Sequence, residues 1–305
     1  MYGTSEAAKK DLKMDDREYA YLKAIIKDLS GIDLSSYGER QMRRRLTAFV
    51  TRTPTSNIVS YCQMLQRDEA MLRELLVFLT IKVTEFFRDA SAFRQLETLI
   101  LPRLLTYGRR LNIWCAGCSS GCEPYSLAII LSRICPGHHH RIMATDVDEV
   151  ALSRARDGGP CHSAEVRNLS EGVLQEYFRV SGRSYWISDK IRQAVQFERH
   201  DLLSDPFDCG FDLIMCRNVT IYLTEEARNR LNRRFYESLK SGGVIFIGGT
   251  ESIFDATEIG FTRLDHCFYT KSSNDALRSM KANRSFTPTE ESRGRRNAAD
   301  ICTVF

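Results

Sequence analysis

The stretch that decides the fold is LNIWCAGCSSGCEPYSLA, residues 111–128. Four of its first five residues are apolar, as expected of a strand that is buried on both faces. Small residues follow between Gly117 and Gly121, where the backbone can approach a ligand closely. Pro124 then stands in a first helical turn, where its missing N–H would have no partner anyway. The stretch therefore predicts a strand, a tight turn and a helix whose N-terminus meets the turn.

A second strand with an acidic end completes this unit. Residues 141–146 form a short apolar run that ends in Asp146, roughly 25 positions past the glycine loop. A carboxylate at this spacing can bind the two hydroxyls of a ribose, and Asp148 can cap the next helix. Because Gly-x-x-x-Gly replaces the full dinucleotide fingerprint, a nucleoside without phosphates fits at least as well as a dinucleotide. The alternative is an ordinary βαβ unit with no ligand.

Composition sets the class of protein. The chain has 305 residues, of which 43% are hydrophobic and 27% charged, so we expect a globular protein with a large core and two domains. Its net charge of +4 is too small to indicate nucleic-acid binding. No run approaches the ~20 apolar residues of a membrane span, and the polar start is unlike a signal peptide. We expect a cytoplasmic monomer without direct membrane insertion.

The cysteines and histidines do not predict a metal site. The 10 cysteines lie mainly inside apolar runs, which is typical of reduced core thiols. Cys115, Cys118 and Cys122 are close together, but no second cysteine or histidine pair follows at zinc-site spacing. The three histidines at 138–140 are most simply a solvated turn before a strand.

Four helices are predicted before residue 82, at 17–29, 39–50, 54–65 and 71–79. The first ends at Gly31, and the third opens at Pro54. Together they predict a small all-helical domain at residues 15–82.

The helix at 39–50 carries a one-sided group of arginines. Its apolar residues lie on one face, while Arg40, Arg43 and Arg44 point away from that face. We call these three residues the arginine stripe. Only Glu39 is expected nearby to balance them, so the stripe predicts an acidic partner; the alternative is an ordinary solvated surface.

The chain after residue 157 first departs from the βαβ pattern and then returns to it. Residues 183–188 and 194–198 are predicted strands of a small antiparallel insert at about 157–199. The main sheet resumes at 211–216, which ends at Arg217 and Asn218, polar residues at the carboxyl end of a strand, where open α/β sheets bind ligands. A helix at 225–239, a strand at 244–247 and a hairpin at 261–271 follow. Residues 273–305 are predicted to be disordered because their apolar content collapses.

Four ordered motifs then point to a family. They are Thr84-x-Phe86-Phe87-Arg88, Gly121-x-Glu123-Pro124-Tyr125-Ser126, Ala144-Thr145-Asp146-x-Asp148 and Cys216-Arg217-Asn218-Val219-x-Ile221-Tyr222. In this order they resemble the motifs of the chemotaxis receptor glutamate methyltransferases, the CheR family, over residues 15–272. The resemblance implies an α/β fold of class I methyltransferase type: a doubly wound, mostly parallel, Rossmann-like sheet at residues 83–272, with the helical domain before it and the β insert within it.

The resemblance also implies the reaction and its residues. A methyl group passes from S-adenosylmethionine to glutamate side chains on the cytoplasmic helical domain of chemotaxis receptors, and S-adenosylhomocysteine is the product. The arginine stripe, inferred from the charge pattern, supplies the expected receptor-binding residues, and Arg88 is the expected positioning residue of the catalytic site. The implied cofactor contacts are Thr84, Arg88, Glu123, Asp146, Asp201, Leu202, Arg217 and Asn218. Lys82, a ninth candidate, takes the place of an asparagine common in the family, and Cys122 the place of a glutamate.

The chemistry of this reaction needs no conventional base. A glutamate side chain with a pKa near ~4.3 is already an anion at neutral pH, and the methyl group leaves a sulfonium. Both charges disappear on transfer, so a partly dry site favours the transition state. Two alternatives stay open: a methyltransferase of the same fold for another substrate, and a regulatory module that binds the cofactor without catalysis.

The turn of the insert bears on how a receptor is recognised. Some members of the family hold a C-terminal receptor peptide on this insert, next to a long, glycine-rich turn. Here the turn is only Val180-Ser181-Gly182-Arg183. The short turn predicts a tight hairpin and a protein that does not require a C-terminal pentapeptide tether.

Overall fold

The computed structural model describes residues 14–53, 55, 57–79, 84–108 and 110–272. The chain divides into two compact units. The first comprises Met1–Ile81 and Tyr222–Arg228, and the second Lys82–Ile221 and Asn229–Phe305. In the part of the chain that the structure describes, no helix is long and apolar enough to cross a membrane, and no group of histidine, cysteine or acidic residues could hold a metal ion. The predictions for Lys82, Pro54 and the tail at 273–305 lie outside the described residues.

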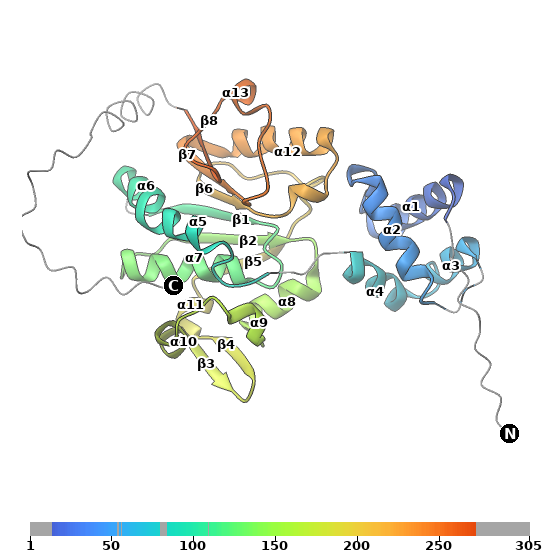
Figure 1. The fold of residues 1–305 in the computed structure, drawn as a ribbon, viewed down its shortest axis with the longest axis horizontal. Helices are drawn as coiled ribbons and strands as arrows, with labels where there is room; N and C mark the ends of the chain where they lie inside the picture. The colour runs from blue at the N-terminus through green and yellow to red at the C-terminus, as the bar shows by residue number, and fades with distance from the viewer. Residues whose placement is uncertain (1–13, 54, 56, 80–83, 109, 273–305) are drawn as a thin grey trace, which may run out of the picture. The chain divides into compact units, whose positions relative to one another are not determined.

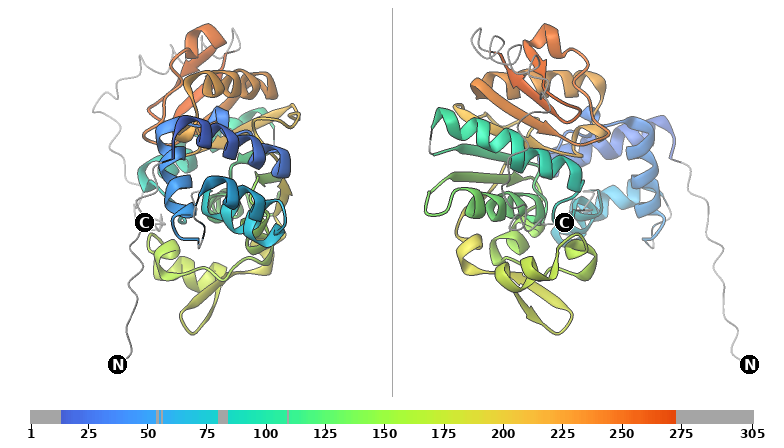
Figure 2. Two further views of the ribbon diagram at one scale, coloured as in Figure 1. Left: turned by 90° about the vertical axis from the view of Figure 1, so that its right-hand side faces the viewer. Right: turned by 60° about the vertical axis from the view of Figure 1, so that its left-hand side comes forward.

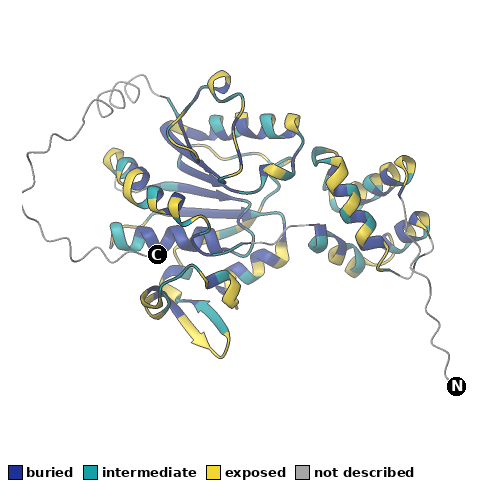
Figure 3. Ribbon diagram, viewed as in Figure 1, coloured by how far each residue is buried: buried dark blue, intermediate teal, exposed yellow. Residues whose placement is uncertain are grey.

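The first unit is helical, as predicted. Asp15 begins α1 with a capping box, because its side chain accepts the Glu18 N–H at 2.8 Å while Glu18 returns a bond to the Asp15 N–H. The third helix begins at Ile58, later than predicted, and the Asn57 side chain caps it by accepting the Ser60 N–H. Buried faces and exposed faces alternate around each helix (Figure 3). The elements are α1 (Asp16–Ser30), η1 (Leu34–Ser36), α2 (Glu39–Val50), α3 (Ile58–Leu65) and α4 (Glu69–Leu79).

The second unit is built on one mixed sheet. Within the described residues, seven strands lie in the order β5-β2-β1-β6-β7-β9-β8 (Figure 1). The first five are parallel, while β9 runs antiparallel to β7 and β8 antiparallel to β9. This arrangement confirms the predicted fold class. The strands are β1 (Asn112–Ala116), β2 (Arg141–Asp146), β5 (Val195–Arg199), β6 (Phe211–Cys216), β7 (Leu239–Ile247), β8 (Phe261–Arg263) and β9 (Phe268–Lys271).

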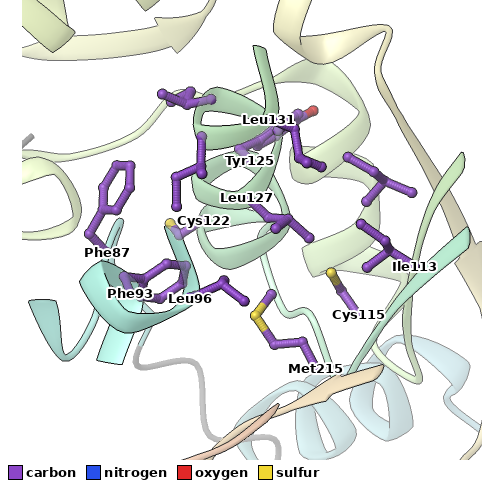
Figure 4. Packing of buried hydrophobic residues seen from close by; sticks show 14 of the residues in the cluster. Phe87, Phe93, Leu96, Ile113, Cys115, Cys122, Tyr125, Leu127, Leu131 and Met215 are labelled. Carbon is purple, nitrogen blue, oxygen red and sulfur yellow. The ribbon is translucent and has the colours of Figure 1, made fainter. Parts of the chain in front are cut away.

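Helices cover both faces of this sheet, as alternate residues of β1 reveal. Ile113 and Cys115 belong to the buried cluster that includes Leu127 of α7 (Figure 4). Trp114, between them, points the other way and contacts the ring of Phe235 on α12 at 5.5 Å. The helices are α5 (Ala90–Gln95), η2 (Leu96–Ile100), α6 (Leu101–Tyr107), α7 (Cys122–Ile134), α8 (Glu149–Asp157), α9 (Ser163–Val166), α10 (Glu171–Tyr177), α11 (Asp189–Arg192), η3 (Thr220–Tyr222), α12 (Glu225–Ser238) and α13 (Ala256–Ile259).

The predicted insert is smaller than expected. Only β3 (Phe178–Ser181) and β4 (Ser184–Ile187) form an antiparallel pair, with Ser181 opposite Ser184, and this hairpin projects from the main sheet (Figure 2). The prediction that residues 194–198 also belong to the insert is wrong: they form most of β5, which pairs in parallel with β2 from Ile142–Val195 to Asp146–Arg199. As an edge strand β5 keeps polar, exposed residues, Gln196 and Glu198, on either side of Phe197, and this alternation imitates an antiparallel strand.

The strand predicted at 244–247 is also longer in the structure. β7 begins at Leu239 and includes the Ser-Gly-Gly run at 241–243 that was expected to close the preceding helix. Its pairing with β6 shifts register between Phe211 and Leu213, and Gly242 has a φ of 77°. The glycines therefore make an irregularity inside the strand, not a loop before it.

Candidate active site

The predicted site residues of the second unit lie largely along one edge of the sheet. β1, β2, β5 and β6 are parallel, so their carboxyl ends share that edge. The loop at 117–121 follows β1, and Asp146 ends β2. Asp201 follows β5, and Arg217 and Asn218 follow β6. The structure thus brings together residues that are far apart in the sequence.

The small-residue loop after β1 is held against the end of β2. The Gly117 and Cys118 N–H groups both donate to the Thr145 carbonyl oxygen, at 2.8 and 2.9 Å. Only glycine fits at position 117, because a Cβ there would lie 2.5 Å from the Val219 side chain and the backbone has a φ of 76°. The loop then leads directly into the N-terminus of α7, as predicted.

Asp146 is half-buried and accepts two backbone hydrogen bonds. Its Oδ2 accepts the Ser119 N–H at 2.7 Å, and its Oδ1 accepts the Asp148 N–H at 2.9 Å. Burial raises the pKa of the Asp146 carboxyl, and these two N–H groups oppose that rise. The carboxylate therefore ties the β1 and β2 loops together.

Asp201 and Leu202 lie beside Asp146. The His200 N–H donates to the Asp146 carbonyl oxygen at 3.0 Å, which fixes the start of the loop after β5. Asp201 Oδ1 accepts the Leu203 N–H at 2.8 Å. These contacts place the 200–203 segment on the same edge as the predicted ribose carboxylate.

Glu123 and Arg217 form a buried ion pair. Arg217 Nη1 lies 2.5 Å from Glu123 Oε1, and the two side chains are 1% and 12% exposed. The Arg217 guanidinium also donates to the Arg88 carbonyl oxygen at 2.9 Å and lies 4.5 Å from the Phe246 ring centre. Burial raises the pKa of the Glu123 carboxyl, while Arg217 and Arg88 lower it. Both residues were expected to touch the cofactor; here the Arg217 side chain is used to hold Glu123.

The segment around Arg88 is fixed by its backbone. The Phe86 N–H donates to the Glu165 carbonyl oxygen at 2.8 Å, and the Phe87 N–H to Ser126 Oγ at 3.0 Å. The rings of Phe86 and Phe87 are fully buried, and Arg88, the next residue, is half-buried.

Cys122, the position where the family commonly has a glutamate, is buried at the start of α7. Its Sγ lies 3.8 Å from Glu165 Oε1, and Thr84 acts to lower the pKa of the thiol. Burial raises the pKa of the Cys122 thiol well above its usual range, so it is protonated at neutral pH. The Cys122 side chain is therefore a neutral thiol that interacts with Thr84, the first residue of the Thr84-x-Phe86-Phe87-Arg88 motif.

Backbone strain marks the same edge. Among the described residues other than glycine, a positive φ occurs at Phe87, Asp89, Ser119 and Asn218, with values of 49°, 64°, 50° and 59°. Phe87 and Asn218 lie in the motifs, and Asp89 and Ser119 lie one and two residues outside them. Such conformations persist only where the surrounding contacts enforce them. Asparagine and aspartate tolerate this conformation, but Phe87 and Ser119 gave no signal of it in the sequence.

Sequence reasoning missed Glu251. This carboxylate follows β7, is 5% exposed and accepts hydrogen bonds from Asn218, Thr220 and Gly248. Asn218 Oδ1 in turn is buried without a hydrogen-bond partner. A buried acceptor without a partner at the strand edge is what a ligand with a donor group would complete.

A cavity of about 420 Å³ elsewhere in the second unit does not include these residues. It is lined by Arg141 and Ile142 at the start of β2 and by Ser132 and Cys135 near the end of α7. It therefore lies at the opposite edge of the sheet from Asp146.

The arginine stripe of α2, in the first unit, differs in part from the prediction. Arg40 and Arg44 are exposed, as expected. Arg43 is only 25% exposed, pairs with Glu39 at 2.5 Å and Asp16 at 2.7 Å, and lies 4.6 Å from the Tyr19 ring centre. The expectation that Glu39 alone balances the stripe is therefore wrong, because Asp16 of α1 also does so. Arg43 joins α1 to α2.

Comparison with known families decides the identity of the chain. Residues 82–267 match the model described as "CheR methyltransferase, SAM binding domain", and residues 17–80 match "CheR methyltransferase, all-alpha domain". The chain belongs to the CheR methyltransferase family. Its second unit therefore carries a domain that binds S-adenosylmethionine (SAM).

Three CheR relatives illustrate the similarity. The chemotaxis protein methyltransferase of Listeria monocytogenes is 40% identical over 257 residues, which are 84% of this chain and 98% of that protein. That of Listeria innocua is 39% identical over the same shares. Chemotaxis protein methyltransferase 1 of Pseudomonas aeruginosa is 32% identical over 77% of this chain and 90% of that protein.

The residues of this CheR chain fit S-adenosylmethionine. Asp146 offers a half-buried carboxylate for hydroxyl donors, and the buried Asn218 Oδ1 has no partner. The amino and hydroxyl groups of the cofactor are donors that both oxygens can accept.

Proposed function

We propose that this CheR methyltransferase methylates glutamate side chains of chemotaxis receptors in the cytoplasm, giving glutamyl methyl esters. The relatives at 39–40% identity carry the name chemotaxis protein methyltransferase, which supports the receptor as substrate. We choose a carboxylate as the nucleophile because of the hydrogen bonds that the acidic residues at the sheet edge already accept.

Three of the carboxylates at this edge already accept hydrogen bonds from the protein itself. Glu123 is paired with Arg217, Asp146 accepts two backbone N–H groups, and Glu251 accepts bonds from three residues. None of these three is poised to remove a proton from an amine or an alcohol. This favours a nucleophile that is already an anion, and a glutamate carboxylate is one at neutral pH.

The residues of the chain then serve to position the reactants. When bound, S-adenosylmethionine supplies a methyl group on a sulfonium; the C–S bond breaks as the carboxylate oxygen forms the new C–O bond. Asp146 holds the ribose hydroxyls, and Asn218 accepts a donor of the cofactor. Thr84, Asp201 and Leu202 complete the contacts. Arg88 pairs with the carboxylate of the cofactor, because a tight pair with the nucleophile would slow the reaction.

Incubation of the protein with radiolabelled S-adenosylmethionine and receptor cytoplasmic fragments tests the proposal. We expect label on the fragment that is released as methanol by base, which is diagnostic of a carboxyl methyl ester. Base-stable label would identify another substrate group. Binding of the cofactor with no transfer to any fragment would support a non-catalytic module.

Reversal of the exposed charges on α2 is expected to impair receptor methylation. Arg40 and Arg44 are the exposed members of the arginine stripe, whereas Arg43 is needed between α1 and α2. A cationic surface attracts an acidic helical receptor, so Arg40→Glu with Arg44→Glu should lower the methylation rate about tenfold or more at low salt. The rate of the parent protein should also fall as salt is added. Initial rates with receptor fragments measure both effects.

The control is a second double reversal in the same unit. Arg67 and Arg73 are also exposed, so Arg67→Glu with Arg73→Glu changes the net charge equally at another place. This control should keep the parent rate, and both double variants should bind S-adenosylhomocysteine as the parent does. Equal methylation rates for the two double variants would show that the arginine stripe has no special role in receptor binding and is an ordinary solvated surface.

We also propose that recognition does not require a C-terminal peptide tether and that the protein acts as a monomer. The β3–β4 hairpin turns through Gly182 and Arg183 alone, which leaves little backbone to close over a docked strand. Titration of C-terminal receptor pentapeptides should therefore show no micromolar binding. Micromolar binding that is lost when only the hairpin residues 179–186 are deleted would contradict this proposal.

A further inference from the structure

Glu251 gathers four hydrogen-bond donors on one buried carboxylate. Its Oε2 accepts the N–H groups of Asn218 and Gly248, both at 2.7 Å. Its Oε1 accepts the Thr220 N–H at 2.8 Å and the Thr220 hydroxyl at 2.7 Å. The side chain is 5% exposed, so these bonds replace water almost entirely. A single side chain from the segment that follows β7 thus fixes the loop that follows the neighbouring strand β6.

The loop that Glu251 holds presents Asn218 in a strained conformation. Asn218 has a φ of 59°, and its Oδ1 is buried without a partner. A left-handed residue with an unpaired buried oxygen is stable only if other contacts hold it. The bond from its N–H to Glu251 is such a contact, because it fixes the backbone from which the side chain projects.

The same loop also constrains the small-residue loop after β1. Val219 lies between Asn218 and Thr220, which both donate their N–H groups to Glu251. Its Cγ2 is where a side chain at Gly117 would collide, at 2.5 Å. A shift of Val219 would therefore change the room available to the 117–121 loop. Glu251 thus contacts the loop after β6 directly and constrains the loop after β1 through Val219.

We infer that Glu251 is a positioning residue of the methyltransferase site, which holds Asn218 and Val219 in the conformation that binds the cofactor. The inference rests on the proposed role of Asn218 and deepens it. Buried groups of this kind orient the residues that touch a ligand, and their loss weakens binding without removing any direct contact.

Glu251→Gln tests this with little change of shape. All four partners of Glu251 donate, but a glutamine amide has one acceptor oxygen and one donor NH₂. If the NH₂ faces Thr220, the hydroxyl can rotate to accept, but the Thr220 N–H loses its partner. If it faces the other way, the N–H groups of Asn218 and Gly248 both lose theirs. Either orientation displaces the loop.

Calorimetry with S-adenosylhomocysteine is the measurement. We expect Glu251→Gln to bind about tenfold more weakly than the parent, the effect of losing one hydrogen bond to a charged group. In an Asn218→Ala background the same change should cost clearly less, because part of its effect passes through Asn218. Unchanged affinity, or losses that simply add, would overturn the inference.

A matched control separates positioning from general stability. Asp212 at the start of β6 also accepts several donors, the Asn112 N–H at 2.7 Å and the Lys240 ammonium at 2.7 and 2.9 Å. Asp212→Asn should lower the melting temperature without changing the affinity for S-adenosylhomocysteine. If it weakens binding as much as Glu251→Gln does, the effect is one of stability and the inference fails.

A second variant serves if Glu251→Gln does not fold. A Cβ on Gly248 would lie 2.7 Å from Glu251 Oε2 and 2.8 Å from Asn218 Nδ2. Gly248→Ala therefore displaces these two side chains without changing the chemical identity of either. It should weaken binding similarly, and parent-like affinity would again overturn the inference. These measurements use no receptor, so a wrong receptor substrate would leave their outcome unchanged.

Discussion

A protein with Arg217→Met is expected to lose about 3–5 kcal/mol of its free energy of unfolding. The Arg217 side chain is 1% exposed and is the partner of Glu123, whose own side chain is 12% exposed. Removal of the guanidinium leaves the Glu123 carboxylate buried without its charge partner and the Arg88 carbonyl oxygen without that donor. A loss of this size is a large part of the total stability of a typical domain. Urea unfolding followed by circular dichroism measures it.

Two further variants establish the cause. Addition of Glu123→Gln to Arg217→Met should restore a large part of the lost stability, because the unpaired charge is then gone. Arg141→Met is the control: Arg141 pairs with Asp208 at 3.4 Å with 39% of its side chain exposed, so its loss should cost only about 0–1 kcal/mol. Equal losses for Arg217→Met and Arg141→Met would show that the buried pair has no special weight.

Asp146→Ala is expected to weaken binding of both S-adenosylmethionine and S-adenosylhomocysteine by about 1.5–3 kcal/mol. This corresponds to about 10–150-fold in the dissociation constant. The carboxylate is proposed to accept the ribose hydroxyls, and its loss also frees the Ser119 N–H, which it accepts at 2.7 Å. Both ligands share the ribose, so both affinities should fall together in calorimetric titrations.

The neighbouring acid Asp148 provides the control. Its side chain caps α8 by accepting the N–H groups of Val150 and Ala151, so Asp148→Ala should cost about 1 kcal/mol of stability. Its backbone N–H, which donates to Asp146, is retained. We expect parent-like affinity for both ligands in this variant. An Asp146→Ala protein that also binds like the parent would remove Asp146 from the site.

The sequence predicts elements best where one pattern dominates. The bounds expected for the helix at 39–50 and for the strands at 141–146 and 211–216 are those of α2, β2 and β6. These segments have clear periodicity or continuous apolar runs, which local physics decides. β5 was assigned to the wrong sheet because an edge strand is partly exposed, and no local pattern states which neighbour it pairs with.

The site was predictable as a set of positions but not as a set of contacts. The strand ends indicated Asp146 and Asn218 because open sheets bind ligands there, whereas Asp201 was implied only by the family resemblance. The pairing of Glu123 with Arg217 joins residues 94 positions apart, and the contact of Arg43 with Asp16 joins two helices. Such partners are set by tertiary structure. Glu251 gave no signal for the same reason, since its donors lie in a loop that packs beside it only after β6 and β7 have paired.

The order in which the chain is synthesised gives the position of Glu251 a consequence for the newly made protein. β5, β2, β1 and β6 can pair once residue 216 has left the ribosome, because these strands are neighbours in the sheet. At that stage the loop at 218–220 still lacks the carboxylate that accepts its N–H groups, since residue 251 is not yet available. With the role inferred for Glu251, four strands of the sheet can thus pair in a nascent chain whose cofactor site is still incomplete.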